Sequence, residues 1–107
     1  MTAIANPIAV VTTVGSKREA RRLALAMVEN HLAACAQIEK IDSVYAWKNR
    51  IERGKEYRVL FKTTEARYAA IENAIRDLHS YELPAIHAVP LAHVSAPYAS
   101  WIEENTR

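Results

Sequence analysis

Cysteine and glycine are both scarce in this 107-residue sequence, which contains one cysteine and two glycines. Because Cys35 stands alone, it offers no internal disulfide and no zinc site made of several cysteines. With only Gly15 and Gly54, the sequence has no glycine-rich phosphate loop and no dinucleotide-binding fingerprint. A single thiol suits a reducing compartment, and the N-terminus lacks the basic segment of a secretory signal, so we expect a cytoplasmic protein.

Long apolar runs and strong net charge are also absent. No apolar stretch approaches the roughly 18 residues of a membrane span. The net charge of +2 is too small to indicate a nucleic-acid or membrane partner. His79 and Glu82 have the residue types of a catalytic acid and base, but no nucleophile or oxyanion device accompanies them. We therefore expect a protein that is not an enzyme.

Regular elements alternate along the rest of the chain. Their βαββαβ order with a further helix predicts an α+β, ferredoxin-like fold with a long central β-hairpin and a short C-terminal helix. We expect one domain over residues 1–107. Ser16 and Glu19 have the spacing of a capping box at the start of the first helix. The predicted elements are a strand at 7–14, a helix from 16 to about 30, strands at 32–47 and 51–62, a helix from 64 to about 78, a strand from 86 to about 93 and a helix at 97–105.

The central hairpin is predicted to be unusually long, because each of its strands exceeds ten residues. Its tip lies at 47–51, where Asn49 tolerates a positive φ. In the second strand Tyr57 and Phe61 share one parity, whereas Glu56 and Arg58 lie on the other, which predicts one wet face. A hairpin of this length projects past its own core, so Trp47 needs the surface of another subunit.

The segment LHSYELPAI, at 78–86, concentrates the candidate functional side chains. His79 is a residue type for metal binding or proton transfer near neutral pH, and Tyr81 and Glu82 follow it in a loop. The alternative is that His79 is simply the C-terminal residue of a helix, where its charge would favour the helix dipole. Cys35 is either a small buried apolar side chain or a reactive thiol, and Lys62 either pairs with an anion or is solvated.

The segments LAACAQI, SVYAWKNRI, FKTT, HSYELPAI and YASWIEE, in this order, closely resemble the CutA divalent-cation-tolerance family over about residues 8–103. The resemblance implies a ferredoxin-like subunit that forms a tight homotrimer, whose hairpins pack across subunits. It also implies association with divalent metal ions, copper in particular. We accordingly expect the homotrimer itself and divalent metal ions as partners, and Tyr45, Trp47 and Trp101 at the trimer interface.

Departures from the family pattern weaken the copper site that the resemblance implies. Ser80 and Ala85 replace a proline and a glutamate, and Thr12 and Leu78 stand where some members carry copper-binding cysteine and histidine. Thiolate and imidazole are the groups that copper prefers. We expect any bound copper to be weak or transient. Its predicted ligands are His79, with Glu82 or Tyr81, and less readily Cys35.

The family also resembles the PII signalling proteins in architecture, which gives an alternative function. In that hypothesis the chain is a small-molecule-binding or signalling module. The clefts between subunits bind a small anion through Lys62, and Tyr81 and Glu82 shape the pocket.

Overall fold

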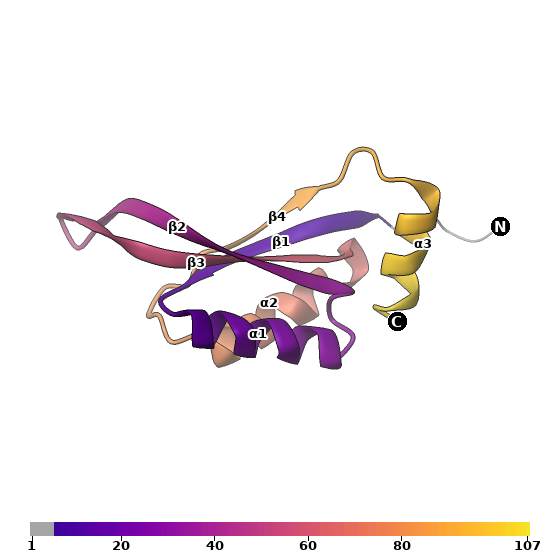
Figure 1. Ribbon diagram of the computed structural model, residues 1–107, viewed down its shortest axis with the longest axis horizontal. Coiled ribbons are helices and arrows are strands. Elements are labelled where there is room, and N and C mark those ends of the chain that lie inside the picture. The colour runs from indigo at the N-terminus through magenta and orange to yellow at the C-terminus, as the bar shows by residue number, and fades with distance from the viewer. Residues whose placement is uncertain (1–5) are drawn as a thin grey trace.

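A computed structural model describes residues 6–107 of the chain. Figure 1 shows a layer of strands, two helices beneath one of its faces, and a third helix at one end. The elements are β1 (Pro7–Val14), α1 (Lys17–Glu29), β2 (Cys35–Trp47), β3 (Arg50–Thr64), a 3-10 turn (Glu65–Arg67), α2 (Tyr68–Leu78), β4 (Ile86–Pro90) and α3 (Ala96–Glu104).

The strands form one antiparallel sheet in the order β2-β3-β1-β4. The two halves of the chain each supply two strands, and β1 and β3 occupy the centre of the sheet. This is the ferredoxin-like arrangement, so the predicted α+β fold is confirmed. The strands at the two edges, β2 and β4, differ in length and sequence, and within residues 6–107 each has one side without a neighbouring strand.

The hydrophobic core lies between the sheet and the pair α1 and α2 (Figure 1). Val10 and Phe61 are register partners, and both are fully buried against this helical layer. Leu23 from α1 and Ile71 from α2 are fully buried in the same cluster. We call the opposite side of the sheet the open face. Part of the open face is covered by α3, which contacts β1 and β3.

Helix α1 begins as the capping pattern predicts, but only half of the capping box forms. The hydroxyl of Ser16 accepts the backbone N–H of Glu19 at 3.1 Å. Glu19 does not reach back to the cap. Its carboxylate instead accepts two hydrogen bonds from Ser80, one from the backbone N–H and one from the hydroxyl, both at 3.1 Å. The start of α1 is thereby tied to the loop after α2.

Strands β2 and β3 form a hairpin that extends well past the helices, at the left of Figure 1. Lys48 and Asn49 link them with φ of 49° and 64°, the two left-handed residues that a type I′ turn requires. The predicted positive φ at Asn49 is therefore confirmed. The right-handed twist of this turn matches that of the flanking strands, so the hairpin continues to its tip.

The prediction of one wet face on β3 is wrong at Glu56. The neighbouring Val59 and Phe61 are buried as expected, but Glu56 is only 9% exposed although it lies on the opposite face. It is buried because a residue from the loop after α2 covers it there.

Element boundaries differ from the predicted ones by a few residues. The second strand starts at Cys35 rather than at residue 32, because the preceding residues turn out of α1 with His31 at a φ of 58°. Thr64 ends β3 and a 3-10 turn separates it from α2. The fourth strand stops at Pro90, whose ring lacks the N–H that a sheet needs. No helix within residues 6–107 is long and apolar enough to cross a membrane.

Candidate functional site

His79 is held by hydrogen bonds to both of its ring nitrogens. It caps the C-terminus of α2 with extended backbone, and its own N–H donates to the carbonyl of Ile75. The backbone N–H of Tyr81 donates to Nδ1 at 3.1 Å, so Nδ1 is the acceptor. Nε2 therefore carries the hydrogen and donates to the carbonyl of Thr13 at 2.7 Å. These bonds fix the orientation of the ring and tie the loop to the end of β1.

Tyr81 fills the space next to Gly15 and reaches the buried carboxylate of Glu56. Its hydroxyl donates to Oε2 of Glu56 at 2.8 Å. A Cβ atom on Gly15 would lie 3.4 Å from that hydroxyl, at ordinary van der Waals distance, so the phenol packs closely beside Gly15. The rings of Tyr81 and His79 are tilted by 56° with centroids 4.7 Å apart. The hydrogen bonds of His79 and Tyr81 thus hold the loop against Glu56.

The environment of Tyr81 raises the pKa of its phenol well above the ordinary value. Burial has the largest effect, followed by the hydrogen bond to Glu56 and the negative charge of that carboxylate. Tyr81 is therefore neutral over the whole physiological range and acts as a hydrogen-bond donor. Burial, with the neighbouring Glu72, likewise raises the pKa of Tyr68.

Glu82 lies in the same loop but points to the tip of the hairpin. Its Oε2 is 3.4 Å from Nζ of Lys48, and both side chains are largely exposed. The Lys48 ammonium also lies 5.5 Å from the centre of the Trp47 ring, within the range of a cation–π contact. This ion pair links the loop to the hairpin. Because both side chains are exposed, it contributes little to stability.

Cys35 and Lys62 form a separate group at the other end of β2. They are register partners, and both approach Tyr98 of α3. The thiol of Cys35 is 3.8 Å from the Tyr98 hydroxyl, and Nζ of Lys62 is 5.9 Å from the ring centre. Lys62 also donates to the side-chain oxygen of Gln37 at 3.1 Å. Burial, with the adjacent thiol, raises the pKa of Tyr98.

The two groups lie far apart within one chain. Cys35 pairs with Lys62 and Lys62 pairs with Ala9, whereas His79 contacts Thr13. Thr13 lies four positions after Ala9 in β1, or roughly 13 Å along the strand. One subunit therefore brings His79, Tyr81 and Glu82 into one loop, but it does not bring Cys35 to them. For the same reason Lys62 and Tyr81 line no common pocket within one chain.

The residues predicted at a subunit interface lie at both ends of the molecule. Tyr45 is 46% exposed on the hairpin, and Trp47 is half-buried at its tip. Trp101 is 40% exposed on α3, where it stacks on Tyr98 with ring centroids 5.7 Å apart. Large aromatic side chains with this much exposure are available for contacts with another molecule.

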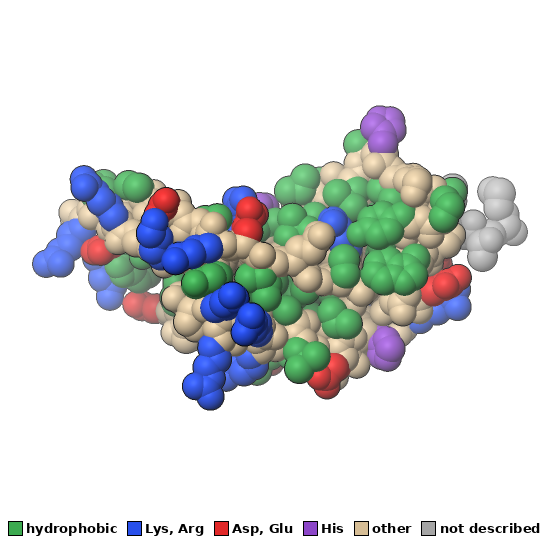
Figure 2. All heavy atoms as spheres, viewed as in Figure 1, with side chains coloured by type: hydrophobic (Ala, Val, Ile, Leu, Met, Phe, Trp, Pro, Cys, Tyr) green, Lys and Arg blue, Asp and Glu red, His purple; other side chains and the backbone are tan. Residues whose placement is uncertain are grey.

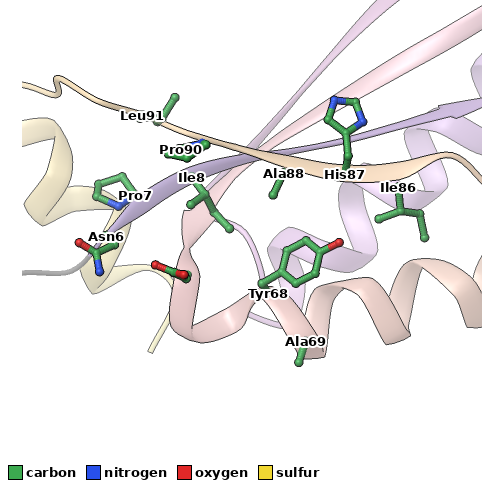
Figure 3. A pocket seen from close by; sticks show the side chains of 11 residues that line it. Asn6, Pro7, Ile8, Tyr68, Ala69, Ile86, His87, Ala88, Pro90 and Leu91 are labelled. Atoms are coloured by element: carbon green, nitrogen blue, oxygen red, sulfur yellow. The ribbon is translucent and has the colours of Figure 1, made fainter.

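The surface of residues 6–107 is hollowed by open cavities, two of which bear on the location of the site. The larger, of about 950 Å³, lies between β4, the start of β1 and the start of α2 (Figure 3). Tyr68 faces this cavity from α2, whereas the ring of His87 points away from the helix (Figure 3). None of the predicted site residues lines it. The smaller cavity, of about 680 Å³, lies between the hairpin and the loop after α2, and its lining includes Tyr45, Trp47, Glu56, Tyr81 and Glu82.

Among the described residues, no group of three or more histidine, cysteine, aspartate or glutamate side chains is arranged to hold a metal ion. A single subunit offers exposed carboxylates such as Glu82, and it offers His79 only if one of the ring hydrogen bonds opens. The metal ligands predicted from the sequence thus stay a prediction.

The geometry first defines a class of protein: a ferredoxin-like subunit whose central hairpin extends past its helical layer (Figure 1). Residues 8–105 match the family model described as CutA1 divalent ion tolerance protein. This chain belongs to the CutA family, as its motifs indicated.

Relatives in this family come from distant organisms. The divalent-cation tolerance protein CutA of Thermus thermophilus is 37% identical over 98 residues, which are 91% of this chain and 95% of that protein. The CutA of Archaeoglobus fulgidus is 34% identical over 92 residues, which are 86% of this chain and 90% of that protein. These names are those of divalent-cation tolerance proteins rather than of enzymes.

Solved structures of the family share the whole fold. CutA1 from Ehrlichia chaffeensis superposes with a TM-score of 0.91 at 29% identity, covering 98% of this chain and 99% of that one. The A. fulgidus structure, described as a periplasmic divalent cation tolerance protein, gives a TM-score of 0.92 at 31% identity, covering 94% and 99%. The comparisons do not favour the PII-like alternative.

Proposed function

We propose that this chain is a non-catalytic, homotrimeric protein of divalent-cation tolerance. The observation that carries the proposal is the family match across residues 8–105, together with relatives named for this role. The lone Cys35 suits a reducing compartment, so we place the trimer in the cytoplasm.

Two features of the subunit support assembly. The first is exposed apolar surface on the hairpin, where Val44 and Ile51 are 70% and 67% exposed. Figure 2 shows a second gathering of hydrophobic side chains at the end of the molecule where α3 lies. A monomer with this much apolar surface in water loses the stabilisation that burial provides.

The second feature is the pair of unlike sheet edges. The thirteen residues of β2 and the five of β4 present unpaired backbone groups at opposite edges. Contacts between unlike surfaces are head-to-tail, and they close into a ring when the rotation allows. In a cyclic trimer the β2 edge of each subunit can pair with the β4 edge of the next. No sheet edge is then left for the addition of further subunits.

Metal binding in this proposal uses His79 and Glu82, with Cys35 contributing only from elsewhere in the trimer. In the tautomer that the hydrogen bonds assign, only Nδ1 has a lone pair, so a metal ion on Nδ1 displaces the N–H of Tyr81, whereas a metal ion on Nε2 first requires the loss of the proton that Nε2 donates to Thr13. The lost bond subtracts from the affinity, so binding is weak. Copper remains the favoured ion because imidazole is among its preferred ligands.

Calorimetric titration of Cu(II) and Zn(II) tests the metal assignment. We expect His79→Ala to bind more weakly than the wild type, and His93→Ala, which removes an exposed histidine, to bind as the wild type does. Equal affinity in all three proteins removes His79 from the site. Sedimentation equilibrium tests the assembly, and a molar mass equal to that of one chain at micromolar concentration contradicts the trimer.

A further inference from the structure

We propose that the cavity between the hairpin and the loop after α2 binds an organic ammonium ion, with Glu56 holding its positive charge. This inference goes beyond divalent-cation tolerance, because its ligand is a carbon-bearing monocation and its central residue is not one of the predicted metal ligands. It rests on three features: the residues on one face of the sheet, an unbalanced buried charge, and the aromatic lining.

The register of the sheet places the cavity on the open face. Thr13 pairs with Arg58, so Glu56, two residues along β3, lies on the same face as Thr13. Glu56 pairs with Ile41 of β2. Tyr45 and Trp47 share the parity of Ile41, so they lie on this face as well. Tyr81, whose hydroxyl reaches Glu56, lines the cavity from the loop after α2.

Glu56 carries a charge that its surroundings do not balance. It is nine-tenths buried, and its one hydrogen bond among the described residues comes from the neutral hydroxyl of Tyr81. No lysine or arginine within residues 6–107 forms an ion pair with it. A carboxylate accepts several hydrogen bonds, and burying it without a cation is unfavourable.

The other two carboxylates of the cavity are already neutralised. Asp42 pairs with Lys55 across the hairpin, and Glu82 pairs with Lys48. All four of these side chains are largely exposed. The cavity thus has one uncompensated negative charge, and that charge lies deep within it.

Aromatic and aliphatic side chains form the rest of the lining and favour an organic cation. Tyr45, Trp47 and Tyr81 line the cavity with Leu83 and Ala85. Aromatic faces attract ammonium groups, and aliphatic walls accommodate their carbon chains. The molecule already contains one such contact, because the ammonium of Lys48 lies over the Trp47 ring beside Glu82.

A bare metal ion fits this cavity less well. Divalent ions need several oxygen, nitrogen or sulfur ligands at once, and no group of three such acidic, histidine or cysteine side chains exists in the described part of the chain. An ammonium ion needs one carboxylate and apolar walls. The volume of about 680 Å³ also lies within the range of small-molecule sites, which are roughly 300–1,000 Å³.

The test is an NMR titration of the full-length chain with n-butylammonium, a monocation with an apolar body, against 1-butanol as its neutral counterpart. We expect saturable shifts of the Tyr81 and Leu83 amides with n-butylammonium, with a dissociation constant in about the millimolar range. Glu56→Gln should weaken binding about tenfold or more. Glu104→Gln makes the same charge change on exposed α3 and should stay within about twofold of the wild type.

Tyr81→Phe is the control for a loss of binding that comes from misfolding. It also alters the site, but it keeps the aromatic ring and the charge of Glu56. This variant should still bind n-butylammonium more tightly than Glu56→Gln does. Equal affinity for 1-butanol and n-butylammonium, equal affinity in Glu56→Gln and wild type, or no saturable shifts at all overturns the proposal. The copper titrations with His79→Ala test a different residue and a different ligand. Failure of one proposal therefore does not contradict the other.

Discussion

The two halves of β3 lie in opposite environments. At its C-terminal end, Val59 and Phe61 are fully buried against α1 and α2, whereas Ile51 near the hairpin tip is 67% exposed. Both segments are strand, and both contain large apolar side chains. The difference is that the helical layer covers one half and leaves the other half bare (Figure 1).

This contrast separates the part of the chain that packs on itself from the part that, in the proposed trimer, meets other subunits. Apolar residues in the covered half find partners within the subunit, so they determine the stability of the fold. Those near the hairpin tip, such as Ile51, are largely exposed within the subunit, so in the proposed trimer their contribution depends on a neighbouring subunit. Substitutions in the two halves therefore have different measurable effects.

The largest effect is expected when a charged side chain replaces an apolar one on the surface of the hairpin. In the proposed trimer, Ile51→Asp places three uncompensated carboxylates at interfaces, each costing several kcal/mol when buried. We expect the molar mass from sedimentation to fall to that of one chain. Leu25→Asp is the matched control, since Leu25 is 61% exposed on α1 and lies outside the hairpin. A trimer that survives Ile51→Asp contradicts the division into two halves.

The covered half is tested by truncating its core. Ile71→Ala removes a fully buried side chain between α2 and the sheet, and such changes cost about 2–5 kcal/mol. The measurement is the free energy of unfolding in urea at several protein concentrations. We expect the same loss relative to the wild type at each of them. A loss below about 1 kcal/mol would mean that the core repacks easily around the missing atoms.

Tyr81 lies at the border between the two halves and links stability to pH. Its folded-state pKa is raised, while an unfolded tyrosine ionises at about 10. The stability from neutral Tyr81 is therefore complete below about pH 10 and is lost as pH rises above it. Tyr81→Phe costs about 1–3 kcal/mol at neutral pH, because Glu56 loses its donor.

Thermal unfolding between pH 8 and about pH 11 checks this sign. The alkaline decline in stability should be shallower in Tyr81→Phe than in the wild type. It should not vanish, because Tyr68 and Tyr98 also have raised pKa values. An identical alkaline decline in both proteins would remove Tyr81 from this role.

The smallest effect is expected at the hairpin turn. Asn49 has a φ of 64°, a conformation that alanine adopts at a cost of about 1 kcal/mol and glycine adopts freely. Asn49→Ala should lower the free energy of unfolding by about that amount, and Asn49→Gly should change it by a few tenths. Urea unfolding of the two variants side by side provides the measurement. A larger loss in Asn49→Gly would show that the asparagine side chain has a role beyond its backbone.

Local signals in the sequence predicted the fold well. The period of two in the strands, the period near 3.6 in the helices and the asparagine at the turn each depend on neighbours within a few residues. These signals placed the hairpin and its tip correctly, and they ended α2 before Pro84. The motifs then identified the family.

The candidate site was predicted only in part, because its contacts join distant parts of the chain. The loop with His79, Tyr81 and Glu82 was found from its composition. Glu56 was missed, since its burial depends on a tyrosine 25 positions later. Likewise His79 binds a carbonyl 66 residues away, and no local pattern shows that its ring is already engaged.

The buried carboxylate of Glu56 implies a trade-off between stability and function. Glutamine has nearly the same shape and still accepts the hydrogen bond from Tyr81, but it carries no charge into the interior. Glu56→Gln should therefore melt at a higher temperature than the wild type while losing its cationic ligand. In the proposed site, the charge of Glu56 thus contributes to ligand binding and lowers the stability of the fold.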